Sequence, residues 1–334
     1  MKIQNIDTNK KIFLIAEIGN NHEGRFNLAK KLIYLAKKNG ADAVKFQFID
    51  PFKLVSPKNN EKRVNQLKRF CLNWDQILKL RRYAKKINIL FLCSIFDFDV
   101  LKKNKNKFSA LKIPSGDNNI IEMIDECINT KKPILYSTGM MSFKMINEII
   151  NKIKRNKNFR KKNFCIMHCV SNYPLKDEDS NMRSILSLKK TGLEIGYSDH
   201  AVGIDNCLVA ATLGARVIEK HFTISNNFSS FRDHIHSADP KKLKELSQKL
   251  KKINLILGDG KKDISKNEEK NIKSTRRGVY ASKKLFKNQI LKNKDIILLR
   301  PETKLKINQI KLAIGKKLKK DINEFEEIKL SNFF

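Results

Sequence analysis

The sequence predicts an α/β protein, a (β/α)8 TIM barrel followed by a small, mostly β domain. Eight short apolar segments typical of buried strands alternate with segments in which apolar residues recur at helical spacing. The alternation extends over roughly 260 residues, close to the usual length of such a barrel. Polar residues stand at the carboxyl ends of most strands, where these barrels carry their chemistry. A doubly wound parallel sheet is the competing class, and the count of eight strands favours the barrel.

The elements follow one another in a regular order. Asp97 is expected to cap a short helix after the third strand. The basic stretch 53–69 has no clear period and is expected to be a loop, a candidate lid. The strands are expected at 13–22, 43–47, 89–96, 110–116, 133–139, 164–170, 194–200 and 216–222, and the longer helices at 28–39, 74–84, 120–129, 143–154, 182–190, 205–213 and 241–257.

A change in pattern divides the chain. The barrel is expected at residues 1–260, a polar linker at 261–274 and the second domain at 275–334, with β-like runs at 278–282 and 296–299. A domain of roughly 60 residues is only marginally stable alone. We therefore expect it to pack on a barrel, its own or a partner's.

Composition indicates a globular chain without a membrane span. The 334 residues are 41% hydrophobic, enough for a sizeable core. No uncharged apolar run reaches about 18 residues, and the first apolar run contains Glu17, unlike a signal peptide. The six cysteines form no Cys-x-x-Cys pair, which argues against a zinc site or a disulfide framework. The expected location is the cytoplasm.

The formal net charge of +35 raises the possibility of a nucleic-acid partner. However, the basic residues, mostly lysine, run through every predicted helix and through both domains. This spread favours compositional bias, so neither a nucleic-acid nor a membrane partner is expected. A general positive field would still attract an anionic substrate.

Charged residues inside apolar strands indicate a site at the barrel mouth. Glu17 is a carboxylate in a buried strand, which is costly unless it is paired. Lys45 and Lys112 are likewise flanked by apolar residues, and with Ser115 and Ser198 they form a plausible cradle for phosphate or carboxylate. The alternatives are a strand that surfaces into a turn, for Glu17, and lysines that snorkel at a rim.

Histidines indicate a possible metal site. All six fall at predicted strand ends or in the loop after the eighth strand, and Glu219 and His221 share a strand face. His221 and His234 could bind a divalent metal together with oxygen ligands. The alternative is that they are hydrogen-bonded structural residues. The loop 232–240 is rich in side chains that can bind a metal, which favours the hypothesis of a metal site.

These segments, in this order, resemble the N-acetylneuraminate (sialic acid) synthase family over nearly the whole chain. The tail, with Arg276-Arg-Gly-Val-Tyr280, Lys287-Asn-Gln-Ile290 and Leu299-Arg-Pro301, resembles the antifreeze-like (SAF) domain. The barrel segments that carry the resemblance are Ile15-Ala-Glu-Ile-Gly-Asn-Asn-His22, Lys45-Phe-Gln47, Lys112-Ile-Pro-Ser-Gly116, Ser137-Thr-Gly-Met140, His168-Cys169 with Tyr173-Pro174, Gly196-Tyr-Ser-Asp-His200, Glu219-Lys-His-Phe-Thr223, and Asp233-His234 with Ser237 and Asp239-Pro240.

The resemblance implies a condensation of phosphoenolpyruvate with an open-chain N-acylated amino sugar. C3 of phosphoenolpyruvate attacks the aldehyde carbon, while a divalent metal, Mn²⁺ or Mg²⁺, polarises the aldehyde oxygen. Water then adds at C2, and the tetrahedral intermediate loses phosphate. The implied metal ligands are His221 and His234.

The resemblance also assigns roles to the strand ends. Lys45 and Lys112 would offset charge on the carboxylate and phosphate, and Glu17 would bind the sugar or assist proton transfer. The implied pocket residues are Gln47, Ser94, Ser115, Asp117, Ser171, Tyr173 and Ser198. The family forms homodimers in which the C-terminal domain caps the partner's barrel, so Arg276 or, with slight preference, Arg277 would contact the N-acyl group.

Some positions depart from the family pattern. Ser94-Ile-Phe-Asp97 stands where Thr-Pro-Phe-Asp is common, and Asp117 stands where Glu often occurs. Ser171 and Gly278 stand where Asn and Ser are common, respectively. None of these changes removes a proposed lysine or metal ligand, but they leave the identity of the sugar open.

The expected function is therefore that of an N-acetylneuraminate synthase using N-acetylmannosamine. A legionaminate or pseudaminate synthase, which takes a diacetamido-trideoxy sugar, is the alternative with the same chemistry. A catalytically inactive barrel that binds nucleic acid or an anionic surface is the alternative of another class.

Overall fold

The computed structural model describes the backbone of all 334 residues and the side chains of residues 1–58 and 60–334. It divides into two compact units, Met1–Gly258 and Asp259–Phe334. No described helix has the length and apolar character needed to cross a membrane.

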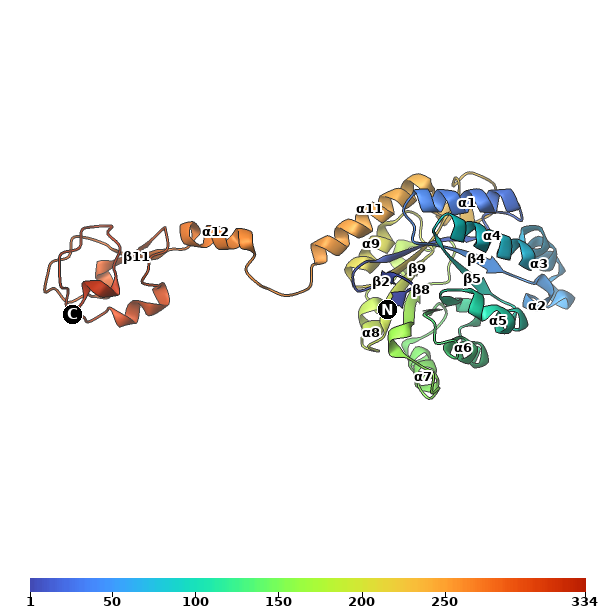
Figure 1. Ribbon diagram of the computed structural model, residues 1–334, viewed down its shortest axis with the longest axis horizontal. Coiled ribbons are helices and arrows are strands. Elements are labelled where there is room, and N and C mark those ends of the chain that lie inside the picture. The colour runs from blue at the N-terminus through green and yellow to red at the C-terminus, as the bar shows by residue number, and fades with distance from the viewer. The chain divides into compact units, whose positions relative to one another are not determined.

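The first unit is a nearly closed barrel of eight parallel strands surrounded by helices (Figure 1). The strand order is β5-β4-β3-β10-β9-β8-β7-β6, and β5 and β6 lie beside each other where the barrel closes. All eight predicted strands are present, which confirms the barrel. They are β3 (Phe13–Gly19), β4 (Ala43–Phe48), β5 (Leu90–Ile95), β6 (Leu111–Ile113), β7 (Ile134–Ser137), β8 (Phe164–Cys169), β9 (Glu194–Asp199) and β10 (Val217–His221).

The predicted long helices are also present and cover the outside of the barrel. Asp97 caps α5, because its side chain accepts a hydrogen bond from the backbone N–H of Val100. The helices are α1 (Phe26–Lys38), α4 (Trp74–Lys86), α5 (Phe98–Asn104), α6 (Ile121–Ile128), α7 (Phe143–Ile153), α8 (Ser184–Lys189), α9 (Asp205–Thr212) and α11 (Pro240–Leu257).

Apolar side chains fill both faces of the strands. A large cluster lies between the strands and the helices, and a smaller one fills the inside of the barrel. Phe13 and Ile15 belong to the inner cluster, as do Met1 and Ile3 from an N-terminal hairpin of β1 (Lys2–Ile3) and β2 (Ile6–Asp7). The side chains that follow the inner cluster along the strands therefore point into the carboxyl-terminal mouth of the barrel.

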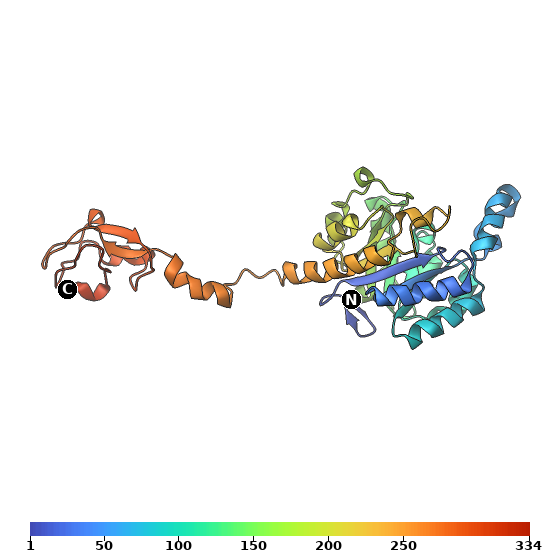
Figure 2. The same ribbon diagram turned by 90° about the horizontal axis from the view of Figure 1, so that it is seen from above.

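The prediction of a loop at 53–69 was wrong. The segment forms α2 (Pro51–Leu54) and α3 (Pro57–Phe70), and α3 projects from the barrel (light blue in Figure 2). Proline stands in the first turn of both helices, a position that suits its fixed φ. Among the described side chains of α3, only Val64 and Leu67 are buried, so too few apolar residues mark the helical period in the sequence.

Two further helices were not predicted. α12 (Lys266–Thr275) occupies the expected linker and begins with a capping box formed by Ser265 and Glu268. α10 (Asp233–His236) is a single turn in the loop after β10.

The second unit has a core of its own. Its strands β11 (Gly278–Ala281) and β12 (Ile296–Leu299) pair antiparallel, as the two predicted β-like runs required. Buried apolar residues, among them Val279, Leu291 and Ile328, fill its interior. The remainder is mostly turns and short 3-10 helices.

Candidate functional site

A cavity of about 840 Å³ opens at the carboxyl ends of the barrel strands. Part of its wall comes from α3, including Arg63 and Phe70, and Phe70 packs on Phe231 of the loop after β10 at a ring-centroid distance of 4.6 Å. The segment expected to be a lid therefore forms a helical side wall. Nine residues predicted from the sequence line the cavity: Glu17, Lys45, Gln47, Lys112, Ser115, Ser171, Tyr173, Ser198 and His221.

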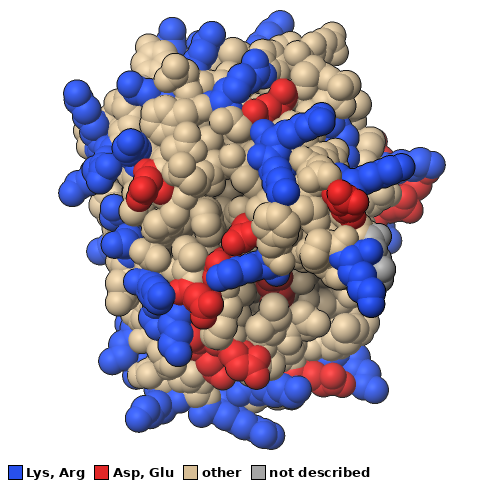
Figure 3. Space-filling view, turned by 90° about the vertical axis from the view of Figure 1, so that its right-hand side faces the viewer, with Lys and Arg blue, Asp and Glu red and all other residues tan. Residues whose placement is uncertain are grey.

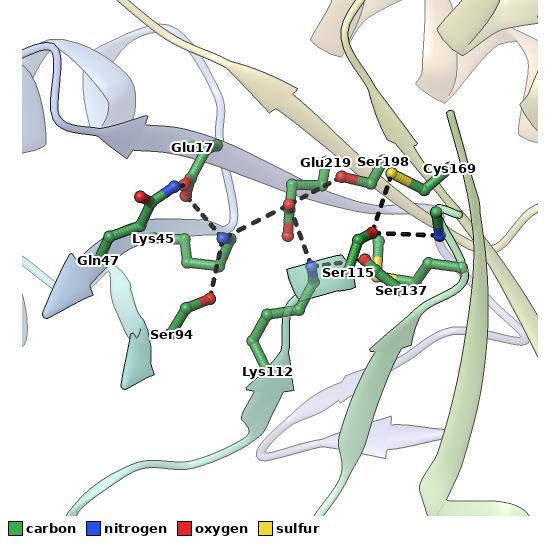
Figure 4. A network of polar contacts seen from close by, with 12 residues as sticks. Glu17, Lys45, Gln47, Ser94, Lys112, Ser115, Ser137, Cys169, Ser198 and Glu219 are labelled. Carbon is green, nitrogen blue, oxygen red and sulfur yellow. Dashed lines mark hydrogen bonds and ion pairs between the residues drawn. The ribbon is translucent and has the colours of Figure 1, made fainter. Parts of the chain in front are cut away.

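Four buried charged side chains form a chain across the barrel mouth, Glu17–Lys45–Glu219–Lys112 (Figure 4). Lys45 Nζ lies 3.0 Å from Glu17 Oε2 and 3.5 Å from Glu219 Oε1. Lys112 Nζ lies 3.4 Å from the same oxygen of Glu219. The acids and bases thus alternate, and each buried charge has an opposite neighbour.

Hydroxyl and amide groups add hydrogen bonds to this network, in which Glu219 Oε2 stays without a partner. Ser198 Oγ donates to Glu219 Oε1 at 2.9 Å, and Gln47 Nε2 donates to Glu17 Oε1 at 2.9 Å. Lys45 Nζ donates to Ser94 Oγ at 3.2 Å. Lys112 Nζ donates to Ser137 Oγ at 2.6 Å.

Strand register explains why these side chains meet. In the parallel pairings, Glu17 stands opposite Lys45 on one side and His221 on the other. Glu219 stands opposite Ser198. Because alternate residues of each strand point inward, the charged residues form the layer directly above the apolar filling of the barrel.

Burial and the neighbouring lysines together shift the pKa values of the two carboxylates in opposite directions. Burial raises the pKa of Glu17, and attraction to Lys45 does not fully offset it. Burial also acts on Glu219, but Lys112 and Lys45 outweigh it and lower the pKa of Glu219. Burial lowers the pKa of Lys112, whereas the two carboxylates hold the pKa of Lys45 above its usual value despite burial. Glu17 is therefore the carboxylate better suited to exchange a proton.

A second polar group lies beside Lys112. Ser115 Oγ accepts a hydrogen bond from the N–H of Gly139 at 3.1 Å and donates to Cys169 Sγ at 3.5 Å. Ser171 Oγ is buried without a partner. A Cβ at position 139 would lie 2.6 Å from Ser115 Oγ and would also collide with Ser171 Oγ, so only glycine fits there. A lysine beside two hydroxyls suits an anionic group such as phosphate or carboxylate.

The histidine arrangement differs from the predicted pair. The ring of His221 lies 5.4 Å from that of His200 and 4.7 Å from that of His236, measured between centroids. His234 instead contacts Thr223 Oγ1 through Nδ1 at 2.6 Å and Glu23 Oε1 through Nε2 at 2.9 Å. Both ring nitrogens of His234 are thus occupied, and the histidines that line the cavity are His200 and His221.

Two imidazoles at the cavity wall could hold a divalent metal. Burial lowers the pKa of His200, but the Cys169 thiol and the carbonyl of Val170 outweigh burial and raise it, so a bound metal would displace the second proton of that ring. Burial, and secondarily the neighbouring His236 and His200, holds the pKa of His221 well below its usual range. His200 Nδ1 donates to the carbonyl of Val170 at 2.8 Å, which leaves Nε2 as the acceptor. Among the described residues, no three His, Cys, Asp or Glu side chains converge as a closed metal site. A metal held by His200 and His221 would therefore need further ligands from substrate or water.

Several predicted residues do not line the cavity. Ser94 is buried beneath Lys45. Asp117 is buried with Oδ2 unpartnered, and burial raises its pKa to about 6. Arg276 and Arg277 are exposed on the second unit, where Arg276 lies 3.9 Å from Glu302.

Cys169, His200 and Glu219 are among the cavity residues that were absent from the predicted site. Glu219 carried a usable signal, because it is a carboxylate in an apolar strand two residues before His221, as Glu17 is in its own strand. His200 also stood at a predicted strand end.

Basic side chains are spread over the face drawn in Figure 3, with acidic ones between them. They form no single stripe on that face. This distribution agrees with the compositional interpretation of the charge.

Comparisons with known proteins agree with the family resemblance of the sequence. The model of the NeuB family matches residues 32–262. The chain is 35% identical to the N,N'-diacetyllegionaminic acid synthase of Campylobacter jejuni, over 96% of this chain and 99% of that protein. It is 33% identical to the human N-acetylneuraminate-9-phosphate synthase, over 75% and 73% of the two chains. The crystal structure of an N-acetylneuraminic acid (sialic acid) synthetase from Leptospira borgpetersenii superposes with a TM-score of 0.76 at 33% identity, over 81% of this chain and 94% of that one.

Proposed function

The chain belongs to the NeuB family of nonulosonate synthases, and from this premise we propose that it condenses phosphoenolpyruvate with an N-acylated amino sugar in a metal-dependent reaction. The observation that carries the proposal is the buried chain Glu17–Lys45–Glu219–Lys112 beside His200 and His221. It offers cations for an anionic substrate, a carboxylate suited to proton exchange and a pair of histidines within one cavity.

The anionic substrate would lie against the lysines. Lys112, Ser115 and Ser171 surround the space that Gly139 leaves open and would hold the phosphate. Lys45 would face the carboxylate and offset charge that develops at C2. Glu219 keeps both ammonium groups in place, since one of its oxygens lies within 3.5 Å of each.

The sugar aldehyde would lie on the histidine side of the cavity. A divalent metal bound by His200 and His221 would polarise the aldehyde oxygen. Glu17 would donate a proton to this oxygen as the bond forms between C3 of phosphoenolpyruvate and the aldehyde carbon. Water would then add at C2 and return a proton to Glu17. The C2 hydroxyl of the tetrahedral intermediate would pass its proton to the leaving phosphate as the C2–O bond to phosphate breaks, which leaves the C2 ketone. The ring of Tyr173 lies over the ring of His200, at a centroid distance of 4.1 Å, and would shield the histidine side of the cavity from solvent.

The names of the relatives help to choose between the candidate sugar substrates. Relatives named for N,N'-diacetyllegionaminic acid align over 96% and 93% of this chain, and one named for pseudaminic acid aligns over all of it. We therefore place a diacetamido-trideoxy sugar first as substrate. N-acetylmannosamine, the sugar expected from the sequence, stays the second candidate and is supported by the sialic acid synthetase structure.

The test is Mn²⁺-dependent phosphate release from phosphoenolpyruvate with each sugar in turn. We expect release with one diacetamido-trideoxy sugar and at least about 10-fold lower kcat/KM with N-acetylmannosamine, because the site would leave an extra hydroxyl unpaired. Preference for N-acetylmannosamine would reverse the choice of sugar. No sugar-dependent release from the folded, metal-loaded protein would contradict the proposed reaction. A reaction without sugar controls for simple hydrolysis.

Gly139→Ala tests the proposed phosphate cradle. The new Cβ would displace Ser115 and Ser171, so we expect kcat/KM for phosphoenolpyruvate to fall about 10- to 100-fold, mainly through KM, from the loss of charge-assisted hydrogen bonds. Gly116→Ala is the matched control, because its Cβ would meet only Phe96 at 3.9 Å. Equal effects of the two substitutions would contradict the assignment of the cradle.

The second unit of the chain has a proposed identity and a proposed role. We propose that it is an antifreeze-like domain and that the protein is a cytoplasmic homodimer in which Arg276 or Arg277 reaches the partner's sugar site. Both arginines are exposed on that unit, which supports this role. A native mass of one 38.7 kDa chain in solution would exclude the dimer.

A further inference from the structure

His236 is a buried histidine that the proposed reaction does not use. It lies at the end of the single turn α10, its side chain has no solvent exposure, and neither ring nitrogen has a hydrogen-bond partner. Nδ1 of His221 is likewise buried without a partner. The two rings lie 4.7 Å apart between centroids, with their planes at 72°.

Three unpartnered nitrogens on two adjacent rings are unusual in a folded protein. A neutral imidazole has one N–H donor and one acceptor, and each carries a desolvation penalty when it is buried alone. Small rotations of the rings, whose centres are 4.7 Å apart, bring two nitrogens to a hydrogen-bond distance of about 2.9 Å. A buried water between them would satisfy the same groups.

The other neighbouring rings offer His221 no such partner. His200 already uses Nδ1 on the carbonyl of Val170 and would use Nε2 on the metal. Tyr173 contacts His221 edge-on at a centroid distance of 6.5 Å, too far for a hydrogen bond between the ring atoms. Among the rings packed around His221, His236 is the one with unused nitrogens.

We propose that His236 is the positioning residue of His221: it accepts a hydrogen bond from Nδ1–H of His221, directly or through one water, and so keeps the lone pair of Nε2 toward the cavity. This proposal rests on the metal-dependent function proposed above. The partner of a metal-binding histidine normally fixes its tautomer and ring orientation. Here a second imidazole takes the place that a carboxylate or a backbone carbonyl more often fills.

The tautomer of His221 can be measured without metal or substrate. Long-range ¹H–¹⁵N NMR of the histidine rings distinguishes an Nδ1–H from an Nε2–H imidazole, and loss of signals in His221→Asn assigns the ring. We expect the Nδ1–H form in the unsubstituted protein and in His236→Gln, whose amide oxygen also accepts a hydrogen bond. We expect a mixture or the Nε2–H form in His236→Phe, which fills the space without an acceptor.

Mn²⁺ affinity gives the second measurement, by the EPR signal of the free ion. We expect His236→Phe to weaken binding about 10- to 100-fold and His236→Gln to restore it to within about 3-fold. Thermal unfolding of each variant verifies that the barrel is intact. If His236→Phe does not fold, His236→Met provides a second side chain without a nitrogen.

The outcomes separate this inference from the function on which it rests. An unchanged tautomer and unchanged Mn²⁺ affinity in folded His236→Phe would overturn the positioning role. Failure of the unsubstituted protein to bind Mn²⁺ would instead contradict the proposed metal dependence, and the NMR comparison would still decide whether His236 sets the tautomer.

Discussion

Lys45→Met is expected to abolish turnover and to lower the free energy of unfolding by about 3–5 kcal/mol. Lys45 lies between Glu17 and Glu219, at 3.0 Å and 3.5 Å. Its removal leaves two buried carboxylates without the cation that separates them. We expect kcat to fall about 10³-fold or more, because Lys45 also offsets charge in the proposed transition state. Phosphate release and urea unfolding measure the two effects.

A double substitution separates stability from catalysis. In Lys45→Met/Glu17→Gln the carboxylate that loses its cation is neutral while Glu219 keeps Lys112, so part of the lost stability should return while activity stays absent. Lys249→Met is the matched control: Lys249 is exposed and pairs with Glu245 at 2.6 Å on the surface of α11, and neither stability nor activity should change measurably. Near-normal stability of Lys45→Met would show that the buried chain of charges is not coupled as proposed.

His221→Asn is expected to remove Mn²⁺-dependent turnover, with a loss of about 10³-fold or more, since polarisation of the aldehyde oxygen is worth several kcal/mol. The barrel should stay folded, because the substitution shortens a side chain at the cavity wall and the amide N–H of asparagine can donate to His236 in place of Nδ1–H. Mn²⁺ binding, followed by EPR, should be lost together with activity.

His234→Asn provides the contrast. His234 is engaged by Thr223 and Glu23, so its substitution should leave Mn²⁺ binding within about 3-fold of normal, far less than the loss of a metal ligand. Loss of Mn²⁺ binding in His234→Asn, with binding retained in His221→Asn, would refute the pairing of His200 with His221.

Most of the fold could be predicted from repeating patterns in the sequence. Eight apolar strands with helices between them limit the chain to few arrangements, and the polar residues at their ends had to meet at one mouth. Glu17, Lys45 and Lys112 could be predicted because a charge in an apolar strand is rarely tolerated without a partner.

Other features had no local signal of sufficient strength. Of the α3 side chains that the structure describes, Val64 and Leu67 alone are buried, so the helical period is hidden among charged residues and the helix depends on packing at the side of the cavity. α12 was missed because a polar stretch resembles a linker, although Ser265 and Glu268 form a capping box.

By itself, the sequence determined the barrel, the polar mouth and the membership of the family. Tertiary structure decided which side chains face one another: Glu219 stands between the two lysines, and His200 rather than His234 lies beside His221. These contacts depend on the register of neighbouring strands and on the path of the loop after β10. Both are set by packing between segments far apart in the chain, which no local pattern encodes.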